Sequence, residues 1–104
     1  MPQYLFIKAD YSVYKIAFDD ILFIEGLDDY LKIHIEKGKP IVARMTMKAM
    51  VEKLPTKEFI RVHRSFIVPF SRIENVRNKV ITLQNEDIPI GASYETEFFK
   101  RFAS

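Results

Sequence analysis

Short segments in which hydrophobic and polar residues alternate recur along the chain. The clearest covers residues 30–36, where Leu31, Ile33 and Ile35 fall on one face and more polar side chains fall on the other. Such alternation predicts a β-strand with one buried face. Three further segments are rich in aromatic and β-branched residues and are separated by turn-forming residues, so we expect strands there as well: residues 4–8, 13–18 and 21–25. A turn at residues 36–40 then leads into a further short segment, residues 40–44.

Ten residues in the middle of the chain, FIRVHRSFIV (59–68), predict two short strands joined by a polar turn. Hydrophobic residues at both ends of this stretch can anchor the strands in a core. A compact group of hydrogen-bond donors lies between them: Arg61, His63, Arg64 and Ser65. A basic connection that is fastened at both ends suits contacts to phosphates and to the edges of bases.

A further hairpin is expected in the last third of the chain. Residues 72–76 can pair with residues 79–83 across Arg77 and Asn78. Asn favours this assignment because it tolerates the left-handed backbone conformation that tight turns need.

Helical periodicity is found in two segments. In residues 46–55, Thr46 can cap the start of a helix and Pro55 can end it. The hydrophobic residues between them recur at the spacing of one helical face: Met47, Met50, Val51 and Leu54. The C-terminal segment predicts a second helix that Ser93 caps, with acidic residues in its first turn and basic residues in its last. Its apolar face is expected to pack onto the sheets: Tyr94, Phe98, Phe99 and Phe102.

The number of short strands and the scarcity of helix predict a mainly β fold, either a sandwich or a layered set of small antiparallel sheets. With 104 residues, of which 48% are hydrophobic, the chain suffices for one core, so we expect residues 1–104 to form a single domain. The absence of cysteine fits a reducing compartment. No apolar run approaches the roughly 18 to 20 residues of a membrane span, and no signal peptide is evident, so we expect a soluble cytoplasmic chain.

Charge is distributed unevenly along the chain. Residues 44–79 contain nine Lys or Arg and three Glu, a balance of +6, whereas the whole chain has a net charge of only +2. This distribution suits a protein that presents one face to a polyanion. Charge alone leaves open an ordinary solvated surface on which the cations scatter after folding.

Candidate catalytic and metal-binding patterns are incomplete. Ser65 lies near His63, but no G-x-S-x-G elbow accompanies it. His34 and His63 are the only histidines, and neither has the spacing of a metal site. The three glycines do not form a phosphate-binding motif. We therefore expect no enzyme activity, no metal ion and no cofactor.

Three motifs in order carry a family resemblance. The segments IEG…DYLKI (24–33), FIRVHRSFIV (59–68) and IPIG…Y (88–94) resemble the LytTR-type DNA-binding domain of bacterial two-component response regulators, over essentially the whole chain. The resemblance implies an elongated stack of small antiparallel sheets with one short internal helix and a C-terminal helix. It further implies sequence-specific binding of double-stranded DNA, as the output domain of a transcriptional response regulator.

In such domains the DNA contacts come from loops. Two loops enter successive major grooves and a third reaches the minor groove between them, usually at direct repeats in promoters, where two copies bind as a dimer. The resemblance also implies that an upstream receiver or sensor domain lies outside this chain, which would then be the C-terminal part of a longer regulator.

Carried over to this sequence, the DNA-contacting loops are residues 27–30, 63–65 and 91–94. The implied DNA-binding residues are Asp29, Tyr30, His63, Arg64, Ser65, Ala92, Ser93 and Tyr94. Arg64 is the strongest candidate, because a guanidinium can form two parallel bonds to a base edge or a phosphate. His63 has a second interpretation, in which it donates to a backbone carbonyl and fixes the turn. Ser93 and free backbone N–H groups at the last helix are expected to form a phosphate site.

The sequence departs from the family pattern at three positions. Asp28 and Ala92 stand where many relatives carry a basic or amide residue and an Arg, and Pro69 stands where Asn is common. These departures leave open an altered DNA sequence preference or weaker DNA binding.

They also leave open a different function, that of a protein-interaction module that has lost DNA readout. Such a module would bind its partners through strand edges and tyrosines: Tyr11, Tyr14 and Tyr30. A third alternative is a single-stranded nucleic-acid binder that stacks bases on these aromatic residues.

Overall fold

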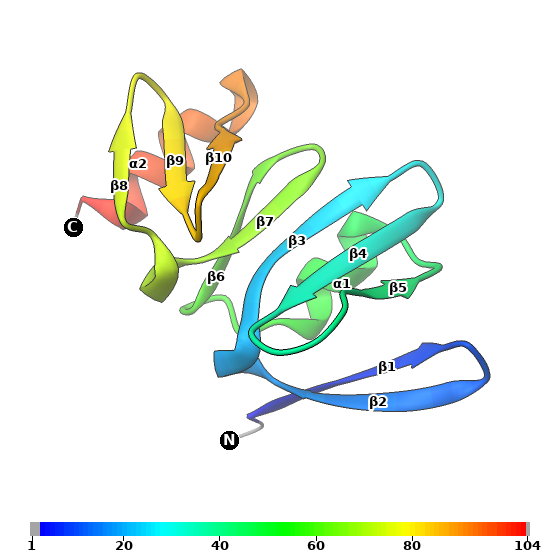
Figure 1. Cartoon of the computed structure of the whole chain (residues 1–104). Coiled ribbons are helices and arrows are strands. Elements are labelled where there is room, and N and C mark those ends of the chain that lie inside the picture. Colours follow the sequence, from blue (N-terminus) through cyan, green and yellow to red (C-terminus); the bar gives the residue numbers. More distant parts are fainter. Residues whose placement is uncertain (1–2, 104) are drawn as a thin grey trace.

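A computed structural model describes residues 3–103 of the chain. Figure 1 shows the arrangement of the elements, which are mostly short strands. The strands are β1 (Tyr4–Ala9), β2 (Ser12–Ala17), β3 (Ile21–Leu27), β4 (Tyr30–Ile35), β5 (Ile41–Ala43), β6 (Phe59–His63), β7 (Phe66–Pro69), β8 (Asn75–Arg77), β9 (Val80–Leu83) and β10 (Glu86–Pro89). The helices are α1 (Met47–Lys53), α2 (Glu95–Phe102) and the short 3-10 helices η1 (Phe18–Asp20), η2 (Phe70–Arg72) and η3 (Ala92–Tyr94).

The strands form three antiparallel sheets. One is the β1–β2 hairpin, one has the order β5-β4-β3-β7-β6, and one has the order β10-β9-β8. Figure 1 shows the five-stranded sheet in the middle, with the hairpin at one end of the molecule and the three-stranded sheet with α2 at the other. The molecule measures 40 × 30 × 25 Å along its principal axes. The predicted stack of small antiparallel sheets with two helices is confirmed.

The central sheet separates two hydrophobic cores. Neighbouring residues of its inner strands enter opposite cores, as Ile67 and Val68 do on β7. This follows from the period of a strand, which points successive side chains to opposite faces. Leu31 and Ile33 enter the core between this sheet, the β1–β2 hairpin and α1, which confirms the half-buried strand predicted there. Strands β3, β6 and β7 are therefore held from both sides.

Helix α1 agrees with its prediction. The side chain of Thr46 accepts a hydrogen bond of 3.0 Å from the backbone N–H of Ala49, and the helix ends at Lys53, shortly before Pro55. Met47 and Met50 are buried in the core beneath the central sheet. The predicted methionine face is thus a packing face.

Helix α2 differs from its prediction at its start and on its outer face. It begins at Glu95 behind the 3-10 helix η3, and its N-cap is Tyr94 with no side-chain cap, so the prediction that Ser93 caps it is wrong. The preceding turn is closed through the backbone instead, since the N–H of Tyr94 bonds to the carbonyl of Gly91. Of the predicted apolar face, Phe98 is fully buried, but Phe99 and Phe102 are 38% and 40% exposed.

The β8–β9 hairpin turns one residue later than predicted. Its turn residues are Asn78 and Lys79, which both have positive φ angles, of 51° and 60°. A two-residue turn of this kind needs a left-handed conformation at both central positions, and this requirement sets the pairing register.

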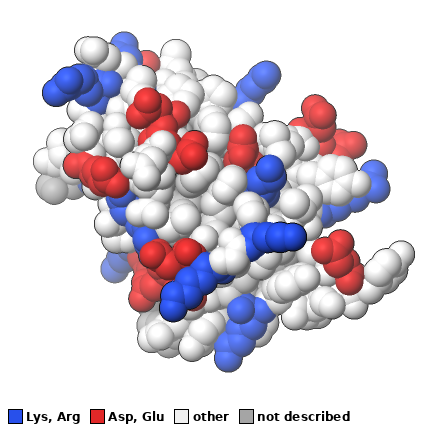
Figure 2. Space-filling view, in the orientation of Figure 1, with Lys and Arg blue, Asp and Glu red and all other residues white. Residues whose placement is uncertain are grey.

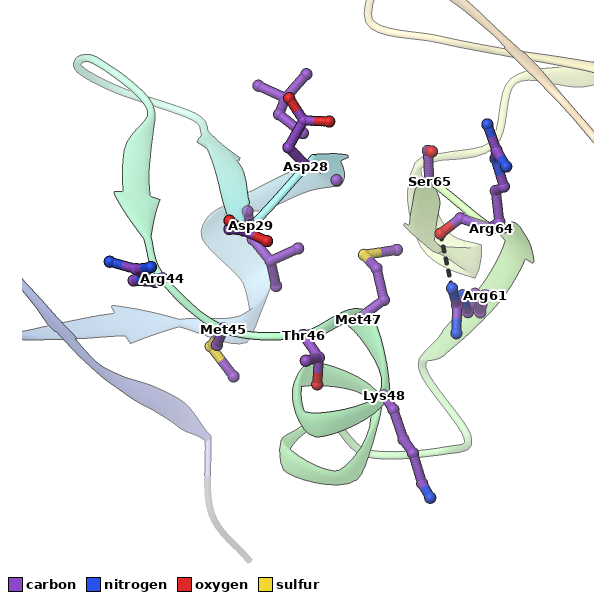
Figure 3. Close-up of a pocket in the computed structure, with 13 residues that line it drawn as sticks. Asp28, Asp29, Arg44, Met45, Thr46, Met47, Lys48, Arg61, Arg64 and Ser65 are labelled. Carbon is purple, nitrogen blue, oxygen red and sulfur yellow. Dashed lines mark hydrogen bonds between the residues drawn. The ribbon is translucent and has the colours of Figure 1, made fainter.

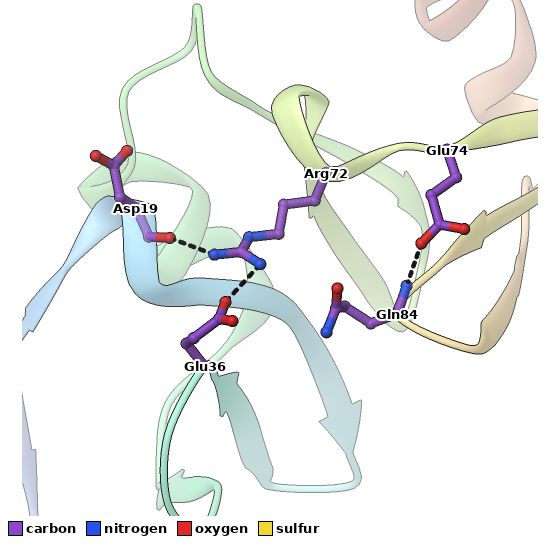
Figure 4. Close-up of polar contacts among 5 residues, drawn as sticks. All are labelled: Asp19, Glu36, Arg72, Glu74 and Gln84. Carbon is purple, nitrogen blue, oxygen red and sulfur yellow. Dashed lines mark hydrogen bonds and ion pairs between the residues drawn. The ribbon is translucent and has the colours of Figure 1, made fainter.

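Arg72, expected in the first strand of that hairpin, lies in η2 and ties distant segments together. Its guanidinium donates to the backbone carbonyl of Asp19 at 2.7 Å and pairs with the Glu36 carboxylate at 2.5 Å (Figure 4). In the next connection, the Glu74 carboxylate accepts a hydrogen bond from the N–H of Gln84. Arg72 is therefore a structural cation.

Candidate nucleic-acid interface

Three connections lie along one edge of the molecule, which we call the loop edge. The first loop (residues 27–30) joins β3 to β4, the second loop (residues 63–65) joins β6 to β7, and the third loop (residues 91–94) leads from β10 to α2. Because β3 and β7 run antiparallel as neighbours, the end of β3 and the start of β7 lie at the same end of the sheet. Figure 1 shows both turns and η3 along this edge.

Backbone hydrogen bonds tie the three loops to one another. The N–H of Gly26 donates to the carbonyl of Ser65 at 2.8 Å and so joins the first loop to the second. The N–H of Gly91 donates to the carbonyl of Val62 at 2.7 Å and joins the third loop to the second. The sheet therefore brings together the three segments that the family resemblance singled out.

The second loop presents Arg64 to solvent. Its side chain extends away from the turn (Figure 3), and among residues 3–103 it forms no hydrogen bond or ion pair. The backbone carbonyl of Arg64, by contrast, accepts a bond of 2.7 Å from the guanidinium of Arg61. The loop thus fixes the main chain of Arg64 and leaves its guanidinium accessible.

His63 stabilises the same turn. Its Nδ1 accepts a hydrogen bond of 3.1 Å from the N–H of Ser65, and its ring lies 5.6 Å from the ring of Phe66. His63 therefore fixes the turn, as one interpretation of the sequence expected. The direction of the hydrogen bond differs, because the imidazole accepts from a backbone N–H and does not donate to a backbone carbonyl. This bond places the proton of a neutral ring on Nε2.

The third loop packs closely against the second. A Cβ atom at Gly91 would lie 3.1 Å from Cδ2 of Tyr94 and 3.5 Å from Cδ2 of His63. The lack of a side chain at Gly91 thus permits this approach. Ala92 and Ser93 are exposed, whereas Tyr94 is half-buried, with its ring centre 5.8 Å from the guanidinium carbon of Arg61.

The first loop is acidic and open. Asp28 and Asp29 are exposed, and within residues 3–103 neither carboxylate forms an ion pair or a hydrogen bond. Asp28 has a positive φ of 53°, which an Asp tolerates in a tight turn. Tyr30, also exposed, has its ring centre 5.9 Å from the guanidinium carbon of Arg44.

An open cleft of about 1020 Å³ separates the first loop from the second. The segment between β5 and α1 forms its floor, and Met47 points into it (Figure 3). Its charged lining residues are Asp28, Asp29, Arg44, Lys48, Arg61 and Arg64. The Asp28 and Asp29 carboxylates and the Arg44 guanidinium lie on the side of the first loop, and the guanidinium groups of Arg61 and Arg64 lie on the side of the second (Figure 3).

A model of the LytTr DNA-binding domain family matches residues 11–103 of the chain. The chain belongs to this family. The solved LytTr DNA-binding domain of a Bacillus cereus protein described as a methyl-accepting/DNA response regulator has the same fold, with a TM-score of 0.83 and 22% sequence identity over 100% of both chains.

Two curated relatives are similar in sequence to this LytTr domain. A sensory transduction protein LytT of Enterococcus faecalis is 28% identical over 100 residues, which cover 88% of this chain and 40% of the relative. An uncharacterized response regulatory protein of Vibrio cholerae is 28% identical over 81 residues, which cover 72% of this chain and 31% of the relative. The chain thus spans less than half the length of both relatives.

Arg61 was predicted among the donors suited to phosphates and base edges, and two of its donors bond to backbone carbonyls. Two further cations that line the cleft of this LytTr domain were not predicted for the site: Arg44 and Lys48. The available signal was the excess of Lys and Arg between residues 44 and 79, which does not say where each cation lies after folding. Pairing of β4 with β5 aligns Leu31 with Ala43, and this register carries Arg44 to the side of Tyr30.

Charges of both signs are interspersed over the face seen in Figure 2, so the basic segment does not form an uninterrupted patch there. Some cations are already paired, as Lys79 is with Glu95 at 3.2 Å. No helix among residues 3–103 is both long and apolar enough to cross a membrane.

Proposed function

We propose that this LytTr domain binds double-stranded DNA in a sequence-specific manner through its three loops, as the output domain of a transcriptional response regulator. One observation carries the proposal. Three loops that are distant in the sequence lie at one edge, are joined by backbone hydrogen bonds, and present an accessible Arg64 guanidinium. The names of the relatives, a sensory transduction protein and a response regulatory protein, support a regulatory role.

In this proposal Arg64 reads the DNA. Its guanidinium is accessible and its backbone is held, so it can form two parallel bonds to the O6 and N7 atoms of guanine or to a phosphate. His63 offers Nε2–H as a further donor, and Ser65 offers its hydroxyl.

The third loop supplies contacts of another kind. Ala92 has no side-chain donor, so recognition there relies on Ser93, on Tyr94 and on backbone N–H groups near the start of α2. Such groups position a protein on phosphates but carry no direct sequence information. We therefore assign base reading chiefly to the second loop.

The proposal extends to the longer protein. Since the chain covers 40% and 31% of its two relatives, we propose that a receiver or sensor domain accompanies it. Two copies would then bind direct repeats in a promoter, and their pairing would set the activity of a cytoplasmic regulator. The residues described here are proposed to act as one DNA-binding domain.

The test is selection of bound sequences from a random duplex library, followed by titration of the recovered site against salt. We expect an enriched repeat and a log-log slope of several units, at about 0.9 per phosphate contacted. The K39M variant is a matched control, because Lys39 is exposed in the connection between β4 and β5, at the end of β4 away from Tyr30. Absence of enrichment together with a flat salt response would contradict the proposal.

One surface favours a second candidate, a protein-interaction module. The β1–β2 hairpin exposes several large apolar side chains: Tyr4, Phe6, Tyr11 and Val13. Tyr14, which was expected to join this docking surface, packs against the core and is only partly exposed. Salt-insensitive binding to a protein, without binding to DNA, would favour this candidate.

Competition between duplex and single-stranded DNA tests the remaining alternative. Preference for the unpaired strand would indicate base stacking on aromatic residues in place of groove recognition.

A further inference from the structure

We infer that Arg61 is a positioning residue, which holds the second and third loops in one arrangement so that Arg64 is presented to DNA. This inference rests on the proposed DNA binding. Arg61 lies on β6 and is half-buried, and its guanidinium lies at the cleft, beside the backbone carbonyl of Arg64 (Figure 3). Its Nη2 donates to the carbonyl of Arg64 at 2.7 Å, and its Nε donates to the carbonyl of His63 at 3.3 Å.

The backbone of β6 explains why Arg61 can reach these carbonyls. The pairing of β6 with β7 shifts between Arg61 and His63, which oppose Ile67 and Phe66 respectively. Val62 is therefore an extra residue, as in a β-bulge, and a bulge changes the direction of the strand and of its side chains. The carbonyl of Val62 is then available to the third loop, where it accepts from Gly91.

Arg61 also contacts the third loop through an aromatic ring. Its guanidinium carbon lies 5.8 Å from the ring centre of Tyr94, within the range of a cation–π contact. One side chain thus bonds two consecutive carbonyls of the second loop and approaches an aromatic ring of the third. A guanidinium suits this position, because its donors form a rigid planar fork that also stacks on rings, whereas an ammonium is a point charge.

These contacts give Arg61 and Arg64 different roles. Two donors of Arg61 point to protein carbonyls, whereas the guanidinium of Arg64 has no hydrogen-bond or ion-pair partner among residues 3–103. Loss of Arg61 should therefore leave the DNA-facing charge in place but allow its backbone to move. Discrimination between DNA sequences should fall, while the number of phosphates contacted should not.

The first experiment compares R61M and R61K with wild type and with K39M on the selected duplex and on a scrambled duplex. We expect R61M to lose on the order of tenfold in affinity for the selected site, similar to loss of one base-reading pair, with an unchanged salt slope. R61K should not restore discrimination, because it keeps the charge but not the fork. A salt slope lower by about one unit in R61M, with rescue by R61K, would show that Arg61 itself contacts a phosphate and would overturn the inference.

A double-mutant cycle gives an independent readout. If Arg61 acts through Arg64, then R61M/R64A should bind the selected site about as weakly as R64A alone. Losses that multiply would mean that the two arginines act separately, and would overturn the inference.

Amide hydrogen exchange in the DNA-free domain separates failure of this inference from failure of the proposed function. The N–H groups of Ser65 and Gly91 are hydrogen-bonded within the loop edge, and R61M should increase their exchange rates. Absence of DNA binding by wild type would refute the proposed function but leave this measurement informative. Unchanged exchange at both amides would refute the role of Arg61. If R61M fails to fold, Y94L removes the aromatic ring that Arg61 approaches and keeps an apolar side chain against the hydrophobic core. This variant should increase exchange at Gly91, and no change there would likewise count against the inference.

Discussion

The first and second loops differ in how far the protein fixes their side chains. Strands β6 and β7, which carry the second loop, are packed between two hydrophobic cores, and its turn is held by hydrogen bonds that Arg61 donates and by one that His63 accepts. The first loop is an acidic turn, and its Asp28 and Asp29 carboxylates have no hydrogen bond or ion pair among residues 3–103. The same sheet supports both loops, but only the second is braced by side chains.

For the proposed DNA binding, this difference indicates where sequence readout would be concentrated. A side chain discriminates between bases only if its backbone is held at a constant distance from the groove, which the second loop provides. The first loop is held by the pairing of β3 with β4, in which Leu27 opposes Tyr30, and by the backbone bond from Gly26 to Ser65, and its Asp28 and Asp29 present negative charge. We therefore propose that the second loop recognises bases and that the first loop disfavours misplaced phosphates.

The largest expected effect comes from the support of the second loop. Ile67 is 1% exposed, packs in the core beneath the central sheet, and pairs with Ile24 and Arg61. I67A should lower the free energy of unfolding by about 2 to 5 kcal/mol, because it removes buried methyl groups and leaves a cavity. Urea denaturation followed by circular dichroism measures this. V42A is the control, since Val42 on β5 is 43% exposed; an equal loss in both variants would contradict the packing argument.

The next effect tests Arg64, the proposed reading residue. R64A should weaken binding to the selected duplex by about 1 to 3 kcal/mol and leave stability unchanged, because the side chain is exposed. R64K keeps the charge but loses the two parallel bonds, so it should retain non-specific affinity and lose specificity. Fluorescence anisotropy on matched and mismatched duplexes separates the two variants. Equal affinity of R64A and wild type for the selected site would show that Arg64 does not read it.

A smaller effect is expected at the glycine between the second and third loops. In G91A the new methyl group would lie 3.1 Å from the Tyr94 ring, so the ring must shift, and we expect binding to weaken by about 1 kcal/mol. Stability should change little, because Gly91 has φ −68° and ψ 148°, a conformation that Ala also adopts. G26A is the matched control: its methyl group would meet the flexible Met47 side chain at 3.4 Å. If G26A weakens binding as much as G91A, spacing between the second and third loops is not the cause.

The parts of this structure that were predictable have local signals. The alternation in residues 30–36 and the methionine spacing in α1 are sufficient because each element buries one face. The capping role of Ser93 was predicted wrongly, because a backbone bond from Tyr94 to Gly91 closes that turn. The brace from Arg61 to Tyr94 joins residues far apart in the sequence and depends on a bulge, so no local pattern reveals it.

The smallest expected effect tests the negative charge of the first loop. D28N removes one exposed negative charge from the cleft, and Asn keeps the positive φ of 53° that this turn requires. We expect duplex binding to strengthen by a few tenths of a kcal/mol at low salt, since a surface charge acts weakly and is screened. The gain in affinity should disappear as salt rises and should be equal on selected and scrambled duplexes, because repulsion of phosphates does not depend on sequence.

Titrations of both duplexes at two salt concentrations measure this gain. D10N is the control, because Asp10 has a similar φ in the β1–β2 turn and does not line the cleft. Weaker binding of D28N to the selected duplex alone would instead mean that Asp28 accepts a hydrogen bond from a base, and the first loop would then be a second reading element.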